Sequence, residues 1–540
     1  MELAKNQEHT VTIEGYGEGG MGVARIDGRV VFVHGALRGE TCRVLILKTL
    51  KSVAFAKVLE VIEPSGARVE SDCPYFPRCG GCTYRHIRYE EELRLKKQRV
   101  QDNLSRIGGS DVTVEEILGA QDTLRYRNKA QYPVSNDGRV GFYRARTHEV
   151  IECEHCLLVK SEADAAAEAL REYMQSCRVA GYDEKTGRGL IRHLYVRSNA
   201  AGESLICVLV NSDKLPKEDW LVALLRDACP KCTGIVLGTN TKKGNVILGD
   251  RYRTLWGSDR LEDTLCGKTF RLSVPSFYQV NRAQAERLYA KTIEFAGLTG
   301  QETVLDLYCG AGTITLALSD HAKKVLGAEI VPEAIDDARE NAARNGVKNA
   351  EFFCGDASDV AKKLARENLR PDVITVDPPR KGLAADVVES IAEMQPGRVV
   401  YVSCDSATMA RDVKRLADLG YTARRACAVD MFPRADHVET VCLLSKLKTK
   451  EHIEIEVKMD ELDLTAAEKK ATYEEIKTYV LEHTGLKVSS LYIAQVKQKC
   501  GIIERENYNK PKSENAKQLQ CPPEKEKAIK EALHHFGMIL

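Results

Sequence analysis

The sequence predicts a doubly wound α/β domain late in the chain, preceded by a small β-barrel and a mixed α/β region. Between about residues 279 and 446, short apolar runs alternate with helical stretches, which is typical of parallel strands joined by helices. Between about residues 10 and 63, short β-rich runs are separated by glycine-rich turns, as in a small barrel. At 540 residues the chain is also too long for one hydrophobic core.

These patterns divide the chain into four predicted domains. The barrel spans residues 1–65, and the mixed α/β central domain spans residues 66–275. The doubly wound domain spans residues 276–446, and a lysine- and glutamate-rich extension of unknown role spans residues 447–540.

The composition is that of a globular protein, with 43% hydrophobic and 29% charged residues and a formal net charge of +1. No segment approaches the roughly 18 consecutive apolar residues of a membrane span, and the first ten residues lack the apolar core of a signal peptide. We therefore expect a cytoplasmic protein with no membrane partner. There the 18 cysteines would be mostly reduced, so a close cysteine cluster indicates metal binding or catalysis rather than disulfides.

A glycine-rich turn opens the doubly wound domain. Val304–Ile314 reads as an apolar strand followed by Gly310-Ala-Gly312 and a helix, and such turns let a nucleotide approach the backbone. The next strands end in Glu329, Asp356 and Asp377. A carboxylate at the end of the second strand can bind ribose hydroxyls, and the set favours S-adenosylmethionine over a dinucleotide. Each carboxylate could instead cap a helix, above all Asp356.

Two further residues point to chemistry at the same edge of the sheet. Cys404 follows the fifth strand, where a neighbouring helix start can lower the pKa of a thiol and make it a nucleophile. Glu439 precedes the last strand and can face the same pocket. The alternative interpretations are a buried packing cysteine and a surface glutamate. A thiol nucleophile with a separate base suits methylation of carbon 5 of uracil, because that carbon becomes nucleophilic only after a thiolate adds at carbon 6.

Five motifs of the doubly wound domain resemble those of a known family. In chain order they are Ser276-Phe-Tyr-Gln-Val-Asn281, Asp306-Leu-Tyr-Cys-Gly310, Asp377-Pro-Pro-Arg380, Ser403-Cys-Asp405 and His437-Val-Glu439. The chain resembles the RNA 5-methyluridine methyltransferases, and among them the 23S ribosomal RNA (uracil-5-)-methyltransferases with an N-terminal TRAM domain and an iron-sulfur cluster. The resemblance implies a Rossmann-like S-adenosylmethionine-dependent methyltransferase domain and an RNA-binding TRAM barrel of the oligonucleotide-binding type.

The resemblance also implies roles for particular residues. Cys404 is the expected nucleophile and Glu439 the expected base. The positions expected to bind S-adenosylmethionine are Gln279, Tyr308, Glu329 and Asp377, with Asp356 and Thr313 as further candidates that differ from some relatives. The expected partner is RNA, in particular 23S rRNA, with transfer RNA as the alternative.

The stretch Cys73-Pro-Tyr-Phe-Pro-Arg-Cys-Gly-Gly-Cys82 places Cys73, Cys79 and Cys82 within ten residues. Four thiolates suit zinc or an iron-sulfur cluster, and the spacing alone leaves both open. The fourth ligand could come from Cys153 and Cys156, or from the Cys229-Pro-Lys-Cys232 pair, whose spacing is familiar from zinc sites. The resemblance implies a [4Fe-4S] cluster held by Cys73, Cys79, Cys82 and Cys156.

A basic segment offers possible contacts to an RNA backbone. Arg125, Arg127 and Lys129 interleave with Tyr126, and Arg144 follows; ordinary surface charge is the simpler interpretation of each.

The sequence leaves two rival functions open. An RNA or DNA amino-methyltransferase also carries Asp-Pro-Pro, but an aromatic residue usually follows there, whereas Arg380 follows here. A noncatalytic iron-sulfur RNA-binding protein would not need Cys404.

Overall fold

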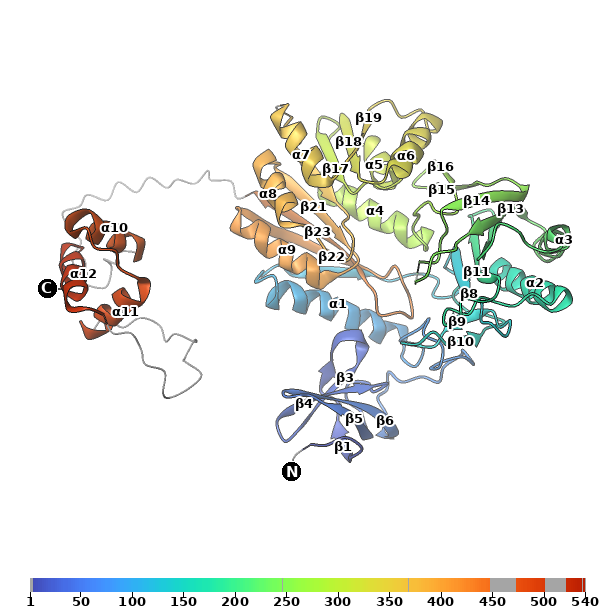
Figure 1. The fold of residues 1–540 in the computed structure, drawn as a ribbon, viewed down its shortest axis with the longest axis horizontal. Coiled ribbons are helices and arrows are strands. Elements are labelled where there is room, and N and C mark those ends of the chain that lie inside the picture. Colours follow the sequence, from blue (N-terminus) through green and yellow to red (C-terminus); the bar gives the residue numbers. More distant parts are fainter. Residues whose placement is uncertain are drawn as a thin grey trace. The chain divides into compact units, whose positions relative to one another are not determined.

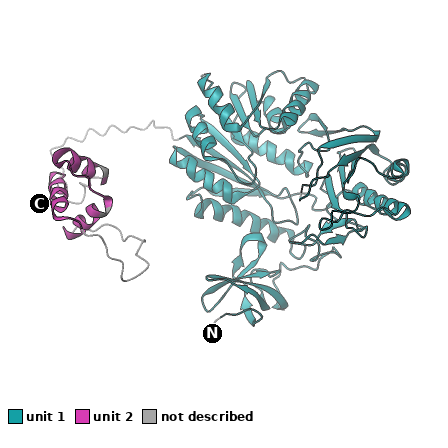
Figure 2. Cartoon of the chain, viewed as in Figure 1, with its two compact units in different colours: residues 1–448 teal, residues 449–540 magenta. Residues whose placement is uncertain are grey.

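The computed structural model describes residues 3–244, 246–367, 369–446, 473–500, 521–536 and 538–539. The chain forms two compact units, residues 1–448 and 449–540 (Figure 2). The second boundary lies close to the predicted start of the extension at residue 447. The other predicted domain boundaries fall inside the first unit and stay predictions.

A six-stranded sheet forms the N-terminal part and has a hydrophobic core of its own. Its strands are β1 (Glu8–Thr12), β2 (Gly15–Tyr16), β3 (Gly22–Ile26), β4 (Arg29–His34), β5 (Thr41–Thr49) and β6 (Val53–Glu63), in the order β1-β5-β6-β4-β3-β2. Alternate residues such as Val31 and Val33, or Val44 and Ile46, are fully buried. This alternation is the two-residue period of half-buried strands, and it confirms the predicted β-rich start.

The central part combines a five-stranded sheet with helices on one of its faces. Its elements are α1 (Tyr89–Arg106), β7 (Val114–Leu118), β8 (Lys129–Pro133), β9 (Gly141–Tyr143), β10 (Val150–Glu152), α2 (Ser161–Cys177), β11 (Ile191–Ser198), β12 (Ser204–Val210), α3 (Glu218–Ala228), β13 (Cys232–Thr239) and β14 (Arg251–Gly257). The sheet has the order β14-β13-β12-β11-β8. Residues of α2 and α3 pack against Leu194, Ile206 and Ile235 in one core.

The third part is the predicted doubly wound domain. Its elements are β15 (Leu261–Leu265), β16 (Lys268–Leu272), α4 (Arg282–Ala296), β17 (Thr303–Leu307), α5 (Thr313–Ser319), β18 (Lys324–Glu329), α6 (Pro332–Arg344), β19 (Ala350–Cys354), α7 (Ala357–Arg366), β20 (Val373–Val376), α8 (Ala385–Met394), β21 (Arg398–Ser403), α9 (Ser406–Asp418), β22 (Tyr421–Val429) and β23 (Glu439–Lys446). Two cores cover its sheet, one with α4, α5 and α6 and the other with α1, α7, α8 and α9 (Figure 1).

The order of this eight-stranded sheet is β19-β18-β17-β20-β21-β23-β22-β7. Strands β17 to β21 are parallel as predicted, whereas β23 runs antiparallel between β21 and β22. Strand β7 adds an edge by pairing with β22. This edge strand was not predicted, since the run Val-Glu-Glu-Ile-Leu is short and carries two charges.

A buried ion network joins α1 to the segment that precedes β23. The Lys96 ammonium donates to Glu92 Oε1 at 2.7 Å, to Asp430 Oδ1 at 2.6 Å and to the Phe432 carbonyl at 3.1 Å. The side chains of Lys96, Glu92 and Asp430 are fully buried. Tyr89 also donates to Asp430, at 2.7 Å. The network anchors residues 430–438, which lead directly to Glu439.

The C-terminal unit contains three described helices, α10 (Tyr473–Thr484), α11 (Ser490–Lys499) and α12 (Pro523–His535). They enclose a small core that includes Ile476, Val480, Ile493, Val496 and Ile529. The helical stretches expected in the extension are therefore present. None of the helices in the described part of the chain is both long and apolar enough to cross a membrane.

Replacing Lys96 by Met tests the buried network. The variant leaves Asp430 buried without its cation and Glu92 with only the longer ion pair to Arg434, at 3.5 Å, so we expect the free energy of unfolding to fall by about 3–5 kcal/mol. Lys324→Ala is the control, since its ion pair with Glu351 at 2.7 Å is about half exposed and should contribute less than about 1 kcal/mol. Urea unfolding of both variants measures the difference, and equal losses would contradict the assigned role of Lys96.

Candidate active site

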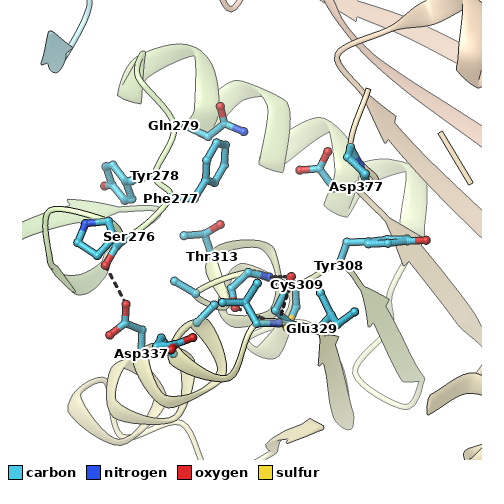
Figure 3. Close-up of a pocket in the computed structure, with 18 of the residues that line it drawn as sticks. Ser276, Phe277, Tyr278, Gln279, Tyr308, Cys309, Thr313, Glu329, Asp337 and Asp377 are labelled. Atoms are coloured by element: carbon cyan, nitrogen blue, oxygen red, sulfur yellow. Dashed lines mark hydrogen bonds between the residues drawn. The ribbon is translucent and has the colours of Figure 1, made fainter. Parts of the chain in front are cut away.

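A large cavity lies at the carboxyl edge of the parallel strands and reaches the central sheet. Its volume is about 1620 Å³. All eight site residues predicted for cofactor binding and catalysis line it: Gln279, Tyr308, Thr313, Glu329, Asp356, Asp377, Cys404 and Glu439. Figure 3 shows several of these side chains around the same space, although they come from separate loops and strand ends. The structure thus brings the predicted residues of this edge together.

The turn after β17 has an unusual backbone. Tyr308, Gly310 and Gly312 all have positive φ angles, of 67°, 54° and 82°. This region suits glycine but costs energy for a tyrosine, and such strain is concentrated at functional sites. The Glu329 carboxylate accepts hydrogen bonds from the Gly310 amide at 3.2 Å and the Val331 amide at 3.0 Å. The turn and the end of β18 therefore hold each other in place.

The buried carboxylate of Asp306 supports this turn. Asp306 accepts hydrogen bonds from the hydroxyls of Thr315, at 2.6 Å, and Thr375, at 2.7 Å. It thereby ties β17 to α5 and to β20. Burial raises the pKa of Asp306 to about 6. Burial, and then the charge of Asp306, raises the pKa of Asp377 to about 7.

The two less secure cofactor candidates have structural partners. Asp356 caps α7, because its side chain accepts a hydrogen bond from the Ser358 amide at 2.9 Å. The capping interpretation of Asp356 is thus confirmed, although the residue also lines the cavity. Thr313 begins α5, and its hydroxyl lies 2.8 Å from the hydroxyl of Tyr289 in α4.

Gln279 belongs to a loop that is held between two parts of the molecule. Arg197 of β11 donates to the Ser276 carbonyl at 2.6 Å, and Asn128 donates to the Gln279 carbonyl at 2.9 Å. From the other side, the Ser276 hydroxyl donates to Asp337 of α6 at 2.8 Å (Figure 3). Between them Phe277 lies at the cavity with 66% of its surface exposed. The loop therefore presents an aromatic ring and an amide to the cavity.

The sheet register places Cys404 beside Glu439. Ser403, the last residue of β21, pairs with Thr440 of the antiparallel strand β23. The next residue on each side is then Cys404 and Glu439, and paired positions lie about 5 Å apart. The Glu439 side chain is buried, with 4% exposure, whereas Cys404 is half-buried. The predicted nucleophile and base therefore face the same cavity.

The electrostatics of this pair differ from the expected ones. Burial, and then Glu439 and Asp377, raises the pKa of Cys404 to about 11, although Arg380 acts in the opposite direction. The prediction that the helix start lowers this pKa is therefore wrong for the free protein, because burial and two carboxylates outweigh it. Burial and Asp377 raise the pKa of Glu439 to about 8, and Arg380 again opposes the shift.

Two neighbours of the pair carried no predicted role. The guanidinium of Arg380 lies 3.2 Å from Nε2 of His437, and both side chains line the cavity. Burial lowers the pKa of His437, so the neutral ring can accept a hydrogen bond from Arg380. The charge of Arg380 lowers the pKa of both Cys404 and Glu439, against burial and the neighbouring carboxylates. The position of Arg380 directly after Asp377-Pro-Pro is the feature of the sequence that could have indicated this role.

The predicted cluster ligands lie near one another outside this cavity. The pKa of Cys79 is raised by burial and also by the neighbouring Cys156 and Cys73. Burial raises the pKa of Cys82 to about 11, with Cys156 and Cys79 contributing. The Gly80 amide donates to the Tyr143 carbonyl at 2.9 Å, which joins the cysteine segment to the β9–β10 hairpin that leads to Cys156. In the described part of the chain, however, no three His, Cys, Asp or Glu residues are grouped closely enough to hold a metal ion.

The alternative pair Cys229 and Cys232 has a different environment. Both side chains belong to the core of the central part. Their thiols donate to carbonyls of Glu162 and Gly234, at 3.4 and 3.3 Å. They therefore behave as packing residues and do not extend the cysteine segment at residues 73–82.

The four predicted backbone-binding cations divide into two groups. Arg125 pairs with Asp164 at 2.6 Å, and Arg144 pairs with Glu149 at 3.0 Å. These two charges are already balanced within the protein. Arg127 and Lys129 lie near the cavity, where Arg127 stacks 5.8 Å from the ring centre of Phe432.

Comparison with known proteins agrees with this arrangement. The family model of tRNA (uracil-5-)-methyltransferases matches residues 88–447, and the TRAM domain model matches residues 3–59. An uncharacterized RNA methyltransferase of Clostridium acetobutylicum is 40% identical over 452 residues, which cover 82% of this chain and 98% of the relative. One of Halalkalibacterium halodurans is 43% identical over 445 residues, covering 82% and 97%. The Pyrococcus abyssi tRNA (uracil-54, C5)-methyltransferase with S-adenosyl-L-homocysteine has a TM-score of 0.66 and 26% identity, covering 81% of this chain and 100% of that one.

The influence of Arg380 on Cys404 predicts a pH dependence. Only the thiolate reacts with iodoacetamide, so alkylation of Cys404 should rise with pH towards its pKa of about 11. In Arg380→Gln the cation that favours the thiolate is lost, and the profile should move to higher pH. Lys348→Gln, an exposed lysine elsewhere in the domain, is the control. Peptide mass spectrometry measures the rates, and an unmoved profile in Arg380→Gln would show that this cation does not act on the thiol.

Proposed function

Because the chain belongs to the tRNA (uracil-5-)-methyltransferase family and transfers a methyl group from S-adenosylmethionine to carbon 5 of uracil in RNA, we propose that it uses Cys404 as nucleophile and Glu439 as base. One observation carries the proposal. The antiparallel register of β21 and β23 sets these two residues opposite each other inside the cavity. Among the described residues, no ion pair balances the buried Glu439 carboxylate beside this thiol.

Cys404 begins the reaction. Its thiolate adds to carbon 6 of the uracil ring, and the electron pair of the double bond between carbons 5 and 6 moves into an enolate. Carbon 5 then becomes nucleophilic enough to accept a methyl group. S-adenosylmethionine supplies that methyl from its sulfonium centre and leaves as S-adenosylhomocysteine.

Glu439 completes the reaction. Its carboxylate removes the proton from carbon 5, and the returning electron pair expels the Cys404 thiolate and restores the double bond. A carboxyl group with a pKa of about 8 binds that proton well and can release it again near neutral pH. Arg380 favours the charged forms of both residues, so it assists the thiolate before attack and the carboxylate before deprotonation.

We assign cofactor binding to Gln279, Tyr308, Glu329 and Asp377. The Glu329 carboxylate stands at the end of β18, the position that binds ribose hydroxyls in open α/β sheets. Tyr308 lies in the turn after β17, two residues before Gly310, and Gln279 and Asp377 line the same cavity as Cys404. We also assign Asp356 and Thr313 to the adenosine end, although both already serve the local fold.

We propose 23S rRNA as the substrate RNA. The resemblance to enzymes that combine a TRAM barrel with a four-cysteine segment supports this target. The similarity to the Pyrococcus abyssi tRNA (uracil-54, C5)-methyltransferase supports transfer RNA as the alternative. In either RNA the base must leave its stack, because a stacked uridine covers carbon 6.

Methylation assays with Cys404→Ala test the mechanism and the target together. RNA from a strain lacking the gene should accept labelled methyl groups in its 23S fraction with the native protein. Cys404→Ala should lose at least about 10³-fold in rate, because the variant lacks the thiol that forms the adduct. Cys177→Ala, at the end of α2 and outside the cavity, should keep native activity. Methylation confined to transfer RNA would select the alternative target, and an active Cys404→Ala would overturn the mechanism.

We also propose that Cys73, Cys79, Cys82 and Cys156 hold a [4Fe-4S] cluster. The chemistry of the donor set supports this, because four thiols can hold such a cluster, and the hydrogen bond from the Gly80 amide to the Tyr143 carbonyl joins the two segments that carry them. The thiols are not grouped as a metal site in the described residues, so binding would have to draw them together. We assign Cys156 because the family resemblance implies it and because its thiol raises the pKa of both Cys79 and Cys82. Cys153 interacts with Cys156 and Cys79 and is the alternative fourth ligand. The cluster takes no part in the reaction steps above.

Metal analysis of anaerobically purified protein tests the cluster. We expect iron and acid-labile sulfide in equal amounts, together with visible absorbance that is lost on chelation. Cys156→Ser should lose most of the iron, whereas Cys232→Ser, in the core of the central part, should keep it. Bound zinc without sulfide would contradict the cluster, and iron retained by Cys156→Ser would contradict the fourth ligand.

A further inference from the structure

Three cations gather where the central sheet meets the catalytic cavity. Lys129 of β8 pairs with Arg197 of the neighbouring strand β11, so their side chains lie on the same face of the sheet. Arg127 precedes Lys129 by two residues. The three charges influence one another, because burial and then the charges of Arg197 and Arg127 lower the pKa of Lys129 to about 8.

No carboxylate balances these charges among the described residues. Arg197 is 2% exposed, and its guanidinium donates only to the Tyr195 hydroxyl and the Ser276 carbonyl, both at 2.6 Å. Its third nitrogen, Nη1, and the Nε of Arg127 are buried without a hydrogen-bond partner. Lys129 is half-buried, and only burial and the two arginines act on it. Buried donors and charges of this kind cost free energy unless a ligand satisfies them.

The three cations, which we call the sheet-edge cations, adjoin the substrate side of the cavity. Arg127 stacks on Phe432 at 5.8 Å, and Arg197 holds Ser276. Phe432 and Ser276 line the cavity together with Cys404. At about 1620 Å³ the cavity also exceeds the roughly 300–1,000 Å³ of a typical small-molecule site, so it has room for a nucleotide beside the cofactor.

We propose that the sheet-edge cations Arg127, Lys129 and Arg197 bind a backbone phosphate of the RNA next to the target uridine. The inference rests on the proposed function, since it assumes that the uridine lies over Cys404. A phosphate oxygen accepts from several N–H groups at once, which suits two guanidinium groups and an ammonium. Such a contact positions the strand without reading its sequence. Arg125 and Arg144, which are paired with carboxylates, are not part of this site.

Binding of poly(U) to Lys129→Gln tests the site, because the probe presents phosphates and uridines whatever the natural target is. We expect affinity to fall about tenfold at low salt, with the slope of log affinity against log salt reduced by about 0.7. Lys129→Arg should restore most of the affinity. Lys214→Gln, an exposed lysine of the same part of the chain, should change neither quantity.

Two controls keep the outcome specific. The melting temperature of Lys129→Gln should be unchanged or higher, because the variant removes a like charge from between two arginines. Affinity for S-adenosylmethionine, measured by calorimetry, should also be unchanged. Weaker cofactor binding with unchanged poly(U) affinity would assign the anion to the cofactor carboxylate and overturn the proposal, as would native poly(U) affinity in Lys129→Gln. Because binding is measured without turnover, failure of Cys404 as nucleophile would leave these results unaffected.

Discussion

The insertion of β23 between β21 and β22 is the constraint on which the active site depends. A fully parallel sheet would carry the chain away from the carboxyl edge after β21. Because β23 runs the opposite way, its first residue arrives at that edge and Glu439 lies opposite Cys404. Asp377 directly follows the neighbouring strand β20 and completes a row of three titratable groups across adjacent strands.

Burial sets the protonation of that row. The pKa of about 8 leaves Glu439 largely neutral at neutral pH in the free protein, whereas the pKa of about 7 leaves Asp377 about half ionised. Protonation of these carboxyls limits repulsion of a thiolate at Cys404. A positively charged methyl donor in the same cavity would favour the ionised forms of all three. We therefore expect Asp377, Glu439 and Cys404 to ionise more readily when the methyl donor binds.

The earlier parts of the chain support the catalytic domain from two sides. Lys96 on α1 holds the segment that leads to Glu439, and the amides of Thr83 and Tyr84 donate to the Arg434 carbonyl of that segment. On the other side, Arg197 and Asn128 hold the loop that carries Gln279. The segment that follows Cys82 thus touches the catalytic domain, although Cys73, Cys79 and Cys82 do not line the cavity.

Strand-helix alternation was enough to predict the doubly wound domain, and strand ends pointed to five of the predicted cavity residues: Glu329, Asp356, Asp377, Cys404 and Glu439. The family resemblance was needed for Gln279, Tyr308 and Thr313. The antiparallel direction of β23 was not predictable, since an apolar run carries no sign of its direction. The raised pKa of Cys404 depends on burial and on Asp377, which is distant in sequence. Arg197 lies within a run that reads as an ordinary strand, and only pairing with β8 places it beside Lys129.

Covalent trapping tests the central claim most directly. In RNA containing 5-fluorouridine, fluorine replaces the proton that Glu439 removes, so the methylated adduct cannot collapse. Mass spectrometry of the digested complex should find a methylated fluorouridine attached to the peptide that contains Cys404. Methyl transfer with no adduct at Cys404, or an adduct at another cysteine, would contradict the account.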